Sequence, residues 1–147
     1  MTRDIDVCLL TGFGNEKKYI KSILENFKTR IKKPLEFAIE NRVLLIKTSN
    51  NVPIDISLSA IEYEKEVIQN SSYYKFPGNC RLKTCSLNDL IILKAFADRN
   101  KDWSDIESII LRNKKSIDKT YILKKLSLFE QIKPDSFIKD KFIKYLN

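Results

Sequence analysis

The sequence predicts an α/β fold with separate helical and sheet parts (α+β): a small mixed or antiparallel sheet followed by a C-terminal helical bundle. Apolar and polar residues alternate along residues 4–10 and Pro53–Ser59, which is the period of a strand with one apolar face. A continuous apolar run within 42–48 is typical of a strand covered on both faces. In the last third, the apolar spacing becomes helical. We therefore place the α/β core at 1–84 and the helical region, packed on that core, at 85–147.

Between the strands, local signals predict the connecting elements. Apolar residues recur at helical spacing over 16–30, with Asn15 as the N-cap and Pro34 ending the helix. The two later strands are separated only by a short polar link, which predicts a hairpin. We expect a short helix at 61–69, and an irregular segment with at most one further strand at 73–84.

The C-terminal region is expected to form about four helices. Ser86 and the acid three residues later form a capping box ahead of a helix at Leu87–Ala97. Asp102 is expected to be the N-cap of the next helix, and Asp118 that of a third. Pro134 introduces the last helix, whose apolar residues lie on one side.

Composition limits the class of protein. The chain has 147 residues, of which 43% are hydrophobic, enough for a real core. It contains no apolar run of about 20 residues and opens with no signal-peptide pattern, so we expect a soluble cytoplasmic protein. Three cysteines without any histidine exclude a Cys/His zinc site and a Cys–His nucleophile, and predict reduced, buried thiols. The formal charge of +8 permits a polyanionic partner without requiring one.

Three aspartates form the candidate site. Asp4 and Asp6 are separated by one residue on a predicted strand, so both side chains leave the same face. Asp55 lies between two isoleucines on a second strand, where an aspartate is disfavoured without a specific reason. If the strands are neighbours, three carboxylates converge, and Mg²⁺ relieves their repulsion. Two such ions, about 4 Å apart, activate an attacking hydroxyl at a phosphoryl group. Solvated polarity at a strand edge is the alternative interpretation of the acid pair.

These residues, together with two later segments, resemble the nucleotidyltransferase superfamily (the polymerase β-like fold). The similarity is closest to the minimal bacterial nucleotidyltransferases and to the abortive-infection type IV toxins, and it spans roughly residues 2–110. The segments that carry it are Thr2-Arg3-Asp4-Ile5-Asp6-Val7, Val52-Pro53-Ile54-Asp55-Ile56-Ser57-Leu58, the helix from Asp89 to Arg99, and Lys101-Asp102-Trp103-Ser104-Asp105-Ile106.

The resemblance implies specific roles. Asp4 and Asp6 bind two catalytic Mg²⁺ ions, and Asp55 is the third carboxylate, which helps to activate the acceptor hydroxyl. Lys94 resembles the family's helical lysine and meets nucleotide phosphates, unless it pairs with a carboxylate such as Asp98. The implied reaction moves an NMP from an NTP to a tRNA 3′ end or a protein hydroxyl. A cognate antitoxin and a role in a toxin–antitoxin or phage-defence system are also implied.

One feature of the superfamily is not matched. Its members carry a Gly-Gly or Gly-Ser pair upstream of the acid pair, where backbone amides hold the triphosphate. Here the acid pair begins at residue 4, so relative to the family we expect an N-terminally truncated core. Gly12 and Gly14 follow the acids, and we expect them to form a strand-to-helix turn.

Two alternatives remain open. A metal-dependent nuclease would also use clustered carboxylates, although the chain has no histidine to act as a separate base. A catalytically inactive nucleotidyltransferase-like module would instead bind a partner through lysines and aromatic residues of the helical region. The residues considered for that surface are Lys114, Lys115, Lys124, Lys125, Tyr121 and Phe129.

Overall fold

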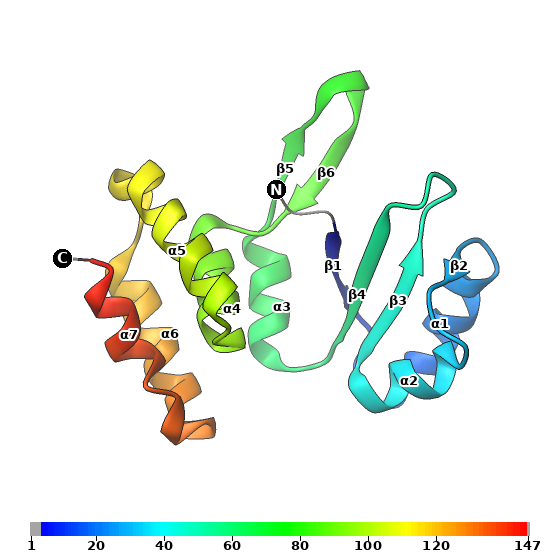
Figure 1. Ribbon diagram of the computed structural model, residues 1–147, viewed down its shortest axis with the longest axis horizontal. Coiled ribbons are helices and arrows are strands. Elements are labelled where there is room, and N and C mark those ends of the chain that lie inside the picture. The colour runs from blue at the N-terminus through cyan, green and yellow to red at the C-terminus, as the bar shows by residue number, and fades with distance from the viewer. Residues whose placement is uncertain (1–3, 147) are drawn as a thin grey trace. The chain divides into compact units, whose positions relative to one another are not determined.

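A computed structural model describes residues 4–146 of the chain; Thr2 and Arg3 of the acidic segment lie outside the described residues. The predicted α/β class is confirmed: a mixed four-stranded sheet and a two-stranded sheet are followed by helices (Figure 1). The chain divides into two compact units, the first ending at Gln69 and the second beginning at Asn70. The division expected after Thr84 remains a prediction about domain organisation.

The first unit contains the four-stranded sheet, in the order β1-β4-β3-β2. Strand β1 (Ile5–Leu10) runs parallel to β4 (Pro53–Ser59), and β3 (Val43–Lys47) pairs antiparallel with β4. The hairpin expected from the short polar link is therefore confirmed. Strand β2 (Lys28–Thr29) lies antiparallel to β3 at the sheet edge.

The helix expected over 16–30 is wrong in its second half. Helix α1 (Glu16–Leu24) ends six residues early, and the chain turns so that Lys28–Thr29 can hydrogen-bond with β3. Pairing with the edge of the sheet thus overrides the continued helical spacing of apolar residues. Pro34 does not end a helix but occupies the first turn of α2 (Pro34–Asn41), where its missing N–H and fixed φ are compatible with a helix.

Two glycines make the turn between β1 and α1, as expected. Gly12 and Gly14 have φ of 70° and 85°, in the left-handed region that favours glycine. The N–H of Gly12 donates to the carbonyl of Ser59 at 3.1 Å, which holds the end of β1 against β4. Asn15 is the N-cap residue of α1, although its side chain makes no capping hydrogen bond.

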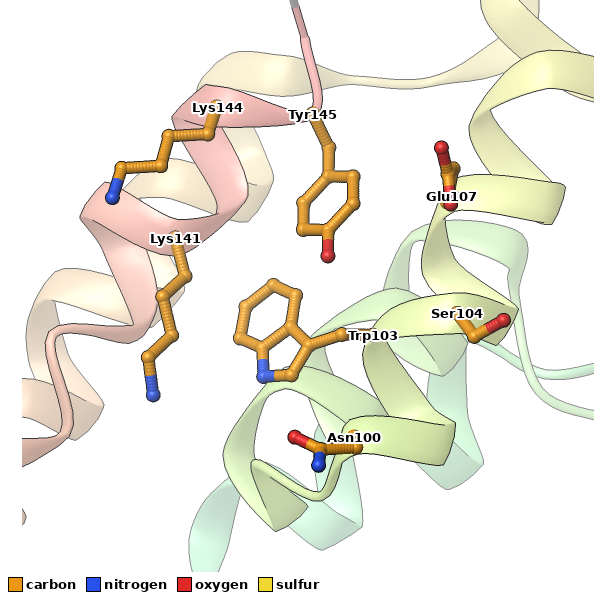
Figure 2. A pocket seen from close by; sticks show the side chains of 7 residues that line it. All are labelled: Asn100, Trp103, Ser104, Glu107, Lys141, Lys144 and Tyr145. Atoms are coloured by element: carbon orange, nitrogen blue, oxygen red, sulfur yellow. The ribbon is translucent and has the colours of Figure 1, made fainter.

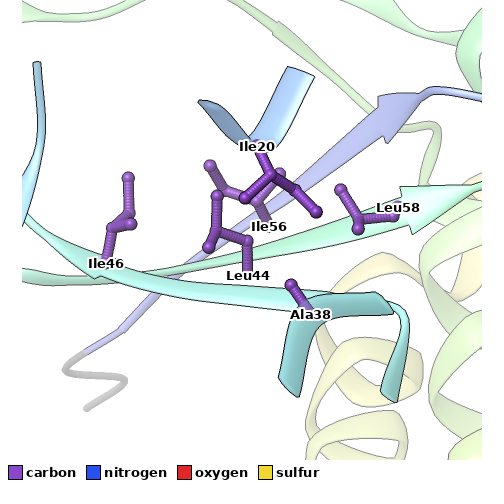
Figure 3. Close-up of a cluster of buried hydrophobic side chains, with 6 residues drawn as sticks. All are labelled: Ile20, Ala38, Leu44, Ile46, Ile56 and Leu58. Atoms are coloured by element: carbon purple, nitrogen blue, oxygen red, sulfur yellow. The ribbon is translucent and has the colours of Figure 1, made fainter. Parts of the chain in front are cut away.

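The core of the first unit lies on one face of the sheet, beneath α1 and α2. Its buried side chains come from both helices and from β3 and β4 (Figure 3). The strand register places Ile5, Val7 and Leu9 of β1 beside Ile54, Ile56 and Leu58 of β4. The buried members of the cluster are Ile20, Ala38, Leu44, Ile46, Ile56 and Leu58. Helix α3 (Glu62–Asn70) follows β4, in agreement with the short helix expected there.

The second unit begins with a two-stranded antiparallel ribbon. Strands β5 (Ser72–Lys75) and β6 (Arg81–Thr84) are joined through the short 3-10 turn Pro77–Asn79. The sequence suggested at most one strand here, because these residues lack a buried face that would give them a period-two pattern. All four residues of β5 are exposed.

Four α-helices follow the ribbon within the described residues, as expected. Ser86 caps α4 by accepting the Asp89 N–H at 3.1 Å, and Asp118 caps α6 by accepting the Tyr121 N–H at 2.9 Å. Asp102, however, is not an N-cap: the N–H groups of Asp102 and Trp103 both donate to the carbonyl of Arg99, so Arg99 takes that position. The helices are α4 (Leu87–Ala97), α5 (Asn100–Asn113), α6 (Lys119–Ile132) and α7 (Ile138–Lys144).

The cysteines differ from the expectation in their exposure to solvent. The three cysteines, all of them described, form no disulfide, but Cys8 and Cys80 are exposed, which corrects the expectation of buried thiols. Cys80 lies in the exposed ribbon, and Cys8 lies on the face of β1 that is turned away from the core.

Within residues 4–146, none of the helices has the length and apolar character needed to cross a membrane.

Candidate carboxylate site

Strand register brings two of the three predicted aspartates together. Asp6 of β1 and Asp55 of β4 are direct partners in the parallel ladder. The residues on either side of Asp55 face the helices, so both carboxylates leave the opposite face of the sheet. Asp4 lies one residue before β1 and is exposed, as is Asp6. The arrangement therefore places the acid pair and the third acid at the same end of two adjacent strands.

An arginine that sequence reasoning missed contacts this site. The Arg30 guanidinium donates a hydrogen bond to Asp55 and forms an ion pair with it. Its backbone N–H donates to the carbonyl of Leu45 at 3.1 Å, and Leu45 is the register partner of Asp55. The sequence placed Arg30 at the end of a helix, and the two-residue strand that actually positions it is too short to leave a periodic signal.

The donor set suits a hard divalent cation, but the side chains are not gathered around one. Mg²⁺ is usually bound by one or two carboxylates together with water and substrate phosphates. Asp6 and Asp55 supply such oxygens from neighbouring strands. Within the part of the chain that the structure describes, no three His, Cys, Asp or Glu side chains form a group able to hold a metal ion. An ion bound at Asp55 would thus share this carboxylate with Arg30 or displace it.

Lys94 lies in the second unit, whereas the three aspartates belong to the first. Its ammonium contacts two carboxylates of α5, at 2.6 Å from Asp105 and 3.7 Å from Asp102. The Lys94 hydrogen bond lowers the pKa of Asp105. Asp102 is nearly fully buried and also accepts from Arg99 at 2.6 and 3.1 Å, and Arg99 is the main cause of its lowered pKa. Lys94 is therefore part of a compact ion-pair network.

Asp98 is not the partner of Lys94, contrary to one interpretation of the sequence. It is the C-cap residue of α4 with a left-handed φ of 55°. Its carboxylate accepts hydrogen bonds from the indole N–H of Trp103 at 2.7 Å and from Lys141 at 2.8 Å. Burial opposes its ionisation, yet Lys141 and Trp103 outweigh that effect and lower the pKa of Asp98. The left-handed cap breaks the helical geometry that an i,i+4 pair needs.

A cavity of about 460 Å³ lies between α5 and α7 of the second unit (Figure 2). Trp103 and Tyr145 stack within it, with ring centroids 5.7 Å apart and planes inclined by 6°. The two rings are therefore parallel and offset from each other. None of the four predicted site residues lines this cavity, whose lining residues are Asn100, Trp103, Ser104, Glu107, Lys141, Lys144 and Tyr145.

The aromatic residues considered for a lysine-rich binding surface belong to helix packing. Phe129 is buried, with its ring centroid 4.6 Å from that of Phe96. The hydroxyl of Tyr121 donates to the Asp89 carboxylate at 2.9 Å. Lys125 lies over the Tyr121 ring at 5.7 Å. The Phe129 ring is therefore not exposed beside the lysines of α6 and does not contribute to a binding surface.

No family model and no curated protein matches the chain. A functional proposal therefore depends on the residues, their geometry and the resemblance carried by the sequence segments.

Proposed function

We propose that this chain is a Mg²⁺-dependent nucleotidyltransferase that moves an NMP from an NTP to a hydroxyl acceptor. The observation that supports the proposal is the pairing of Asp6 with Asp55 in adjacent parallel strands, on the face turned away from the core. Asp4 lies next to this pair in sequence and is accessible to solvent. Carboxylates on a rigid sheet are suited to holding reacting groups in a fixed geometry.

Each side chain has a role in this proposal. Asp4, Asp6 and Asp55 would hold Mg²⁺, which, when bound, offsets phosphate charge and favours attack by a hydroxyl. Asp55 accepts the hydrogen bond of the acceptor hydroxyl and orients it towards the α-phosphorus. Arg30, once released from Asp55, is placed beside the site with a planar guanidinium that binds phosphate oxygens. Pyrophosphate leaves as the nucleotide is transferred.

The identity of the other reactants follows from the resemblance alone. The acceptor is a tRNA 3′ end or a protein hydroxyl, and the biological setting is a cytoplasmic toxin with a cognate antitoxin. The resemblance also implies a phosphate contact for Lys94, whose ammonium in this structure pairs with Asp105 at 2.6 Å.

One observation favours a second candidate, a catalytically inactive binding module. Asp55 already has a cationic partner in Arg30, and the described carboxylates do not form a three-ligand group. In that case the carboxylates of Asp4 and Asp6 would only be hydrated by solvent, and removing them would leave partner binding unchanged.

Isothermal titration of each NTP with Mg²⁺ tests the proposal. We expect one or more NTPs to bind the wild-type chain and to lose binding in Asp4→Ala/Asp6→Ala. A matched control, Asp135→Ala/Asp140→Ala, removes two exposed acids of the second unit and should bind as the wild type does. If a folded wild-type chain bound none of the NTPs, the result would contradict the transferase and leave the binding module.

A further inference from the structure

Two lysines lie opposite each other at one side of the four-stranded sheet. Lys28 of β2 and Lys47 of β3 are direct partners in the antiparallel ladder, so their side chains leave the same face of the sheet. Like charges placed directly opposite each other destabilise a ladder. Within residues 4–146, neither lysine has a carboxylate as an ion-pair partner. The repulsion between them is therefore not offset locally, and an anion bound between them would relieve it.

The face that carries the two lysines also carries the candidate carboxylates. Ile46, next to Lys47, is buried in the core beneath the helices, so Lys47 leaves the opposite face of the sheet. The ladder partner of Lys47 is Pro53, and Asp55 follows two residues later on the same face of β4. Read across the sheet, this face carries acids on β1 and β4 and cations on β3 and β2.

Arg30 connects the lysines to the carboxylates. It follows Lys28 by two residues, and its backbone N–H donates to β3 at the carbonyl of Leu45. Its guanidinium reaches over β3 to the Asp55 carboxylate on β4. We call Lys28, Arg30 and Lys47 the basic cluster of the sheet. Cations and carboxylates thus lie side by side on one face, which is the arrangement that a complex of a metal ion with a polyphosphate requires.

We propose that the basic cluster binds the β- and γ-phosphates of the NTP whose α-phosphate lies at the carboxylates. The inference rests on the proposed function and names the groups that recognise the triphosphate. Arg30 supplies a planar fork of N–H donors for phosphate oxygens, and the two lysines supply point charges. A phosphate between Lys28 and Lys47 replaces their repulsion by attraction. The same cations stabilise the negative charge of pyrophosphate as it leaves.

The position of Lys47 separates this role from protection of the sheet edge. Strand β2 is the last strand of the sheet, and a lysine on an edge strand discourages pairing with another chain. Lys28 alone is explained in that way. Lys47 lies on β3, which pairs with β2 on one side and with β4 on the other, so it has no open edge to protect. Lys47 is therefore the residue that favours a bound anion.

Isothermal titration of inorganic pyrophosphate in EDTA tests the cluster without metal or base. We expect the wild-type chain to bind pyrophosphate, and Lys28→Gln/Lys47→Gln to bind it roughly tenfold more weakly, the scale of lost charge-assisted hydrogen bonds. The matched control is Lys17→Gln/Lys21→Gln, which removes two exposed lysines of α1, the helix that covers the other face of the sheet. Screening by salt should keep the control within about twofold of the wild type. Circular dichroism checks that each variant is folded.

Thermal unfolding gives a second measurement. Without pyrophosphate, Lys47→Gln should raise the melting temperature more than Lys21→Gln does, because only the first removes a like-charge ladder pair. With pyrophosphate, the wild type should gain more than Lys28→Gln/Lys47→Gln, since a ligand stabilises the folded chain in proportion to its affinity. Equal gains in both chains would contradict binding at the lysines.

Three results would overturn the proposal: no pyrophosphate binding by the folded wild type, equal losses of affinity in both double variants, or tighter binding in the lysine-pair variant than in the wild type. Equal losses would indicate attraction of anions to the positive charge of the whole chain.

A titration of NTP with Mg²⁺ distinguishes this failure from failure of the transferase. If Lys28→Gln/Lys47→Gln binds NTP as the wild type does, the cluster is not the triphosphate site and the transferase stands. If no NTP binds but pyrophosphate still binds through the lysines, the transferase is contradicted and the cluster is supported as a pyrophosphate site. Asp4→Ala/Asp6→Ala should keep pyrophosphate binding in EDTA, and loss of that binding would contradict the cluster.

Discussion

The aspartates of the two units differ in how far they are buried and in how many cationic partners they have. In the second unit, Asp102 is nearly fully buried and bound by Arg99 and Lys94, and Asp98 is bound by Lys141 and Trp103. In the first unit, Asp6 is exposed on the sheet, and its neighbour Asp55 has the Arg30 ion pair. The comparison separates aspartates that stabilise helix packing from aspartates that remain accessible to a ligand.

The largest expected effect is on catalysis in the first unit. Asp6→Ala should reduce incorporation of labelled NMP into tRNA or protein by about a thousandfold, because metal-assisted charge stabilisation is worth several kcal/mol. The exposed position of Asp6 implies that the melting temperature changes little. Activity equal to that of the wild type would remove Asp6 from the site.

The opposite result is expected in the second unit. Asp102→Ala leaves Arg99 and Lys94 without their buried partner and should lower the free energy of unfolding by about 2 kcal/mol. Chemical denaturation measures this change. Asp135→Ala, at an exposed position, is the control and should stay within about 0.5 kcal/mol of the wild type. If both variants were equally stable, the ion-pair network would have no structural role.

The stability of the second unit should depend on pH, because its paired aspartates must be ionised. The pKa values of Asp98, Asp102 and Asp105 are lowered in the folded chain. Their contribution to stability is therefore complete above the unfolded pKa of about 4 and is lost as the pH falls through the lower folded values. We expect the melting temperature of the second unit to be steady from about pH 7 to 5 and to fall below about pH 4. In Asp105→Asn this fall should be shallower; an unchanged profile would show that the Lys94 pair does not contribute.

The smallest expected effect concerns the missed arginine. Arg30→Gln removes the cation that competes for Asp55, and should raise the affinity for Mg²⁺ without nucleotide by roughly fivefold, the scale of a partly exposed ion pair. Titration calorimetry with Mg²⁺ alone provides the measurement, and Lys32→Gln is the control for lost charge. Unchanged affinity would mean that Asp55 does not take part in metal binding.

The success of prediction depended on how far apart the interacting residues lie in sequence. Strand β4 was predicted with its observed bounds because the alternation of Ile54, Ile56 and Leu58 with polar residues is a local signal. The caps at Ser86 and Asp118 were also predicted, because each involves a backbone N–H three residues away. The carboxylate pair was inferred on the condition that two strands are neighbours, and the parallel β1–β4 ladder meets that condition.

Features that were missed depend on distant partners. Strand β2 exists because β3 offers an open edge, and its formation breaks the predicted helix and brings Arg30 to Asp55. The cation that Asp98 meets lies 43 residues away in α7. Local propensity does not predict such contacts, because they form only when distant segments pack together in the folded chain.

The sequence by itself determined the α/β class, the order of most elements and the residue types of the candidate site, because periodicity and capping act over a few residues. Only the tertiary structure decided which carboxylates are paired with cations and which face water. It also decided that Tyr73, Lys75, Arg81 and Lys83 share one face of a ribbon. The physical reason is that burial, strand register and ion pairing arise from contacts between segments far apart in the chain, and these contacts form only when the segments fold together.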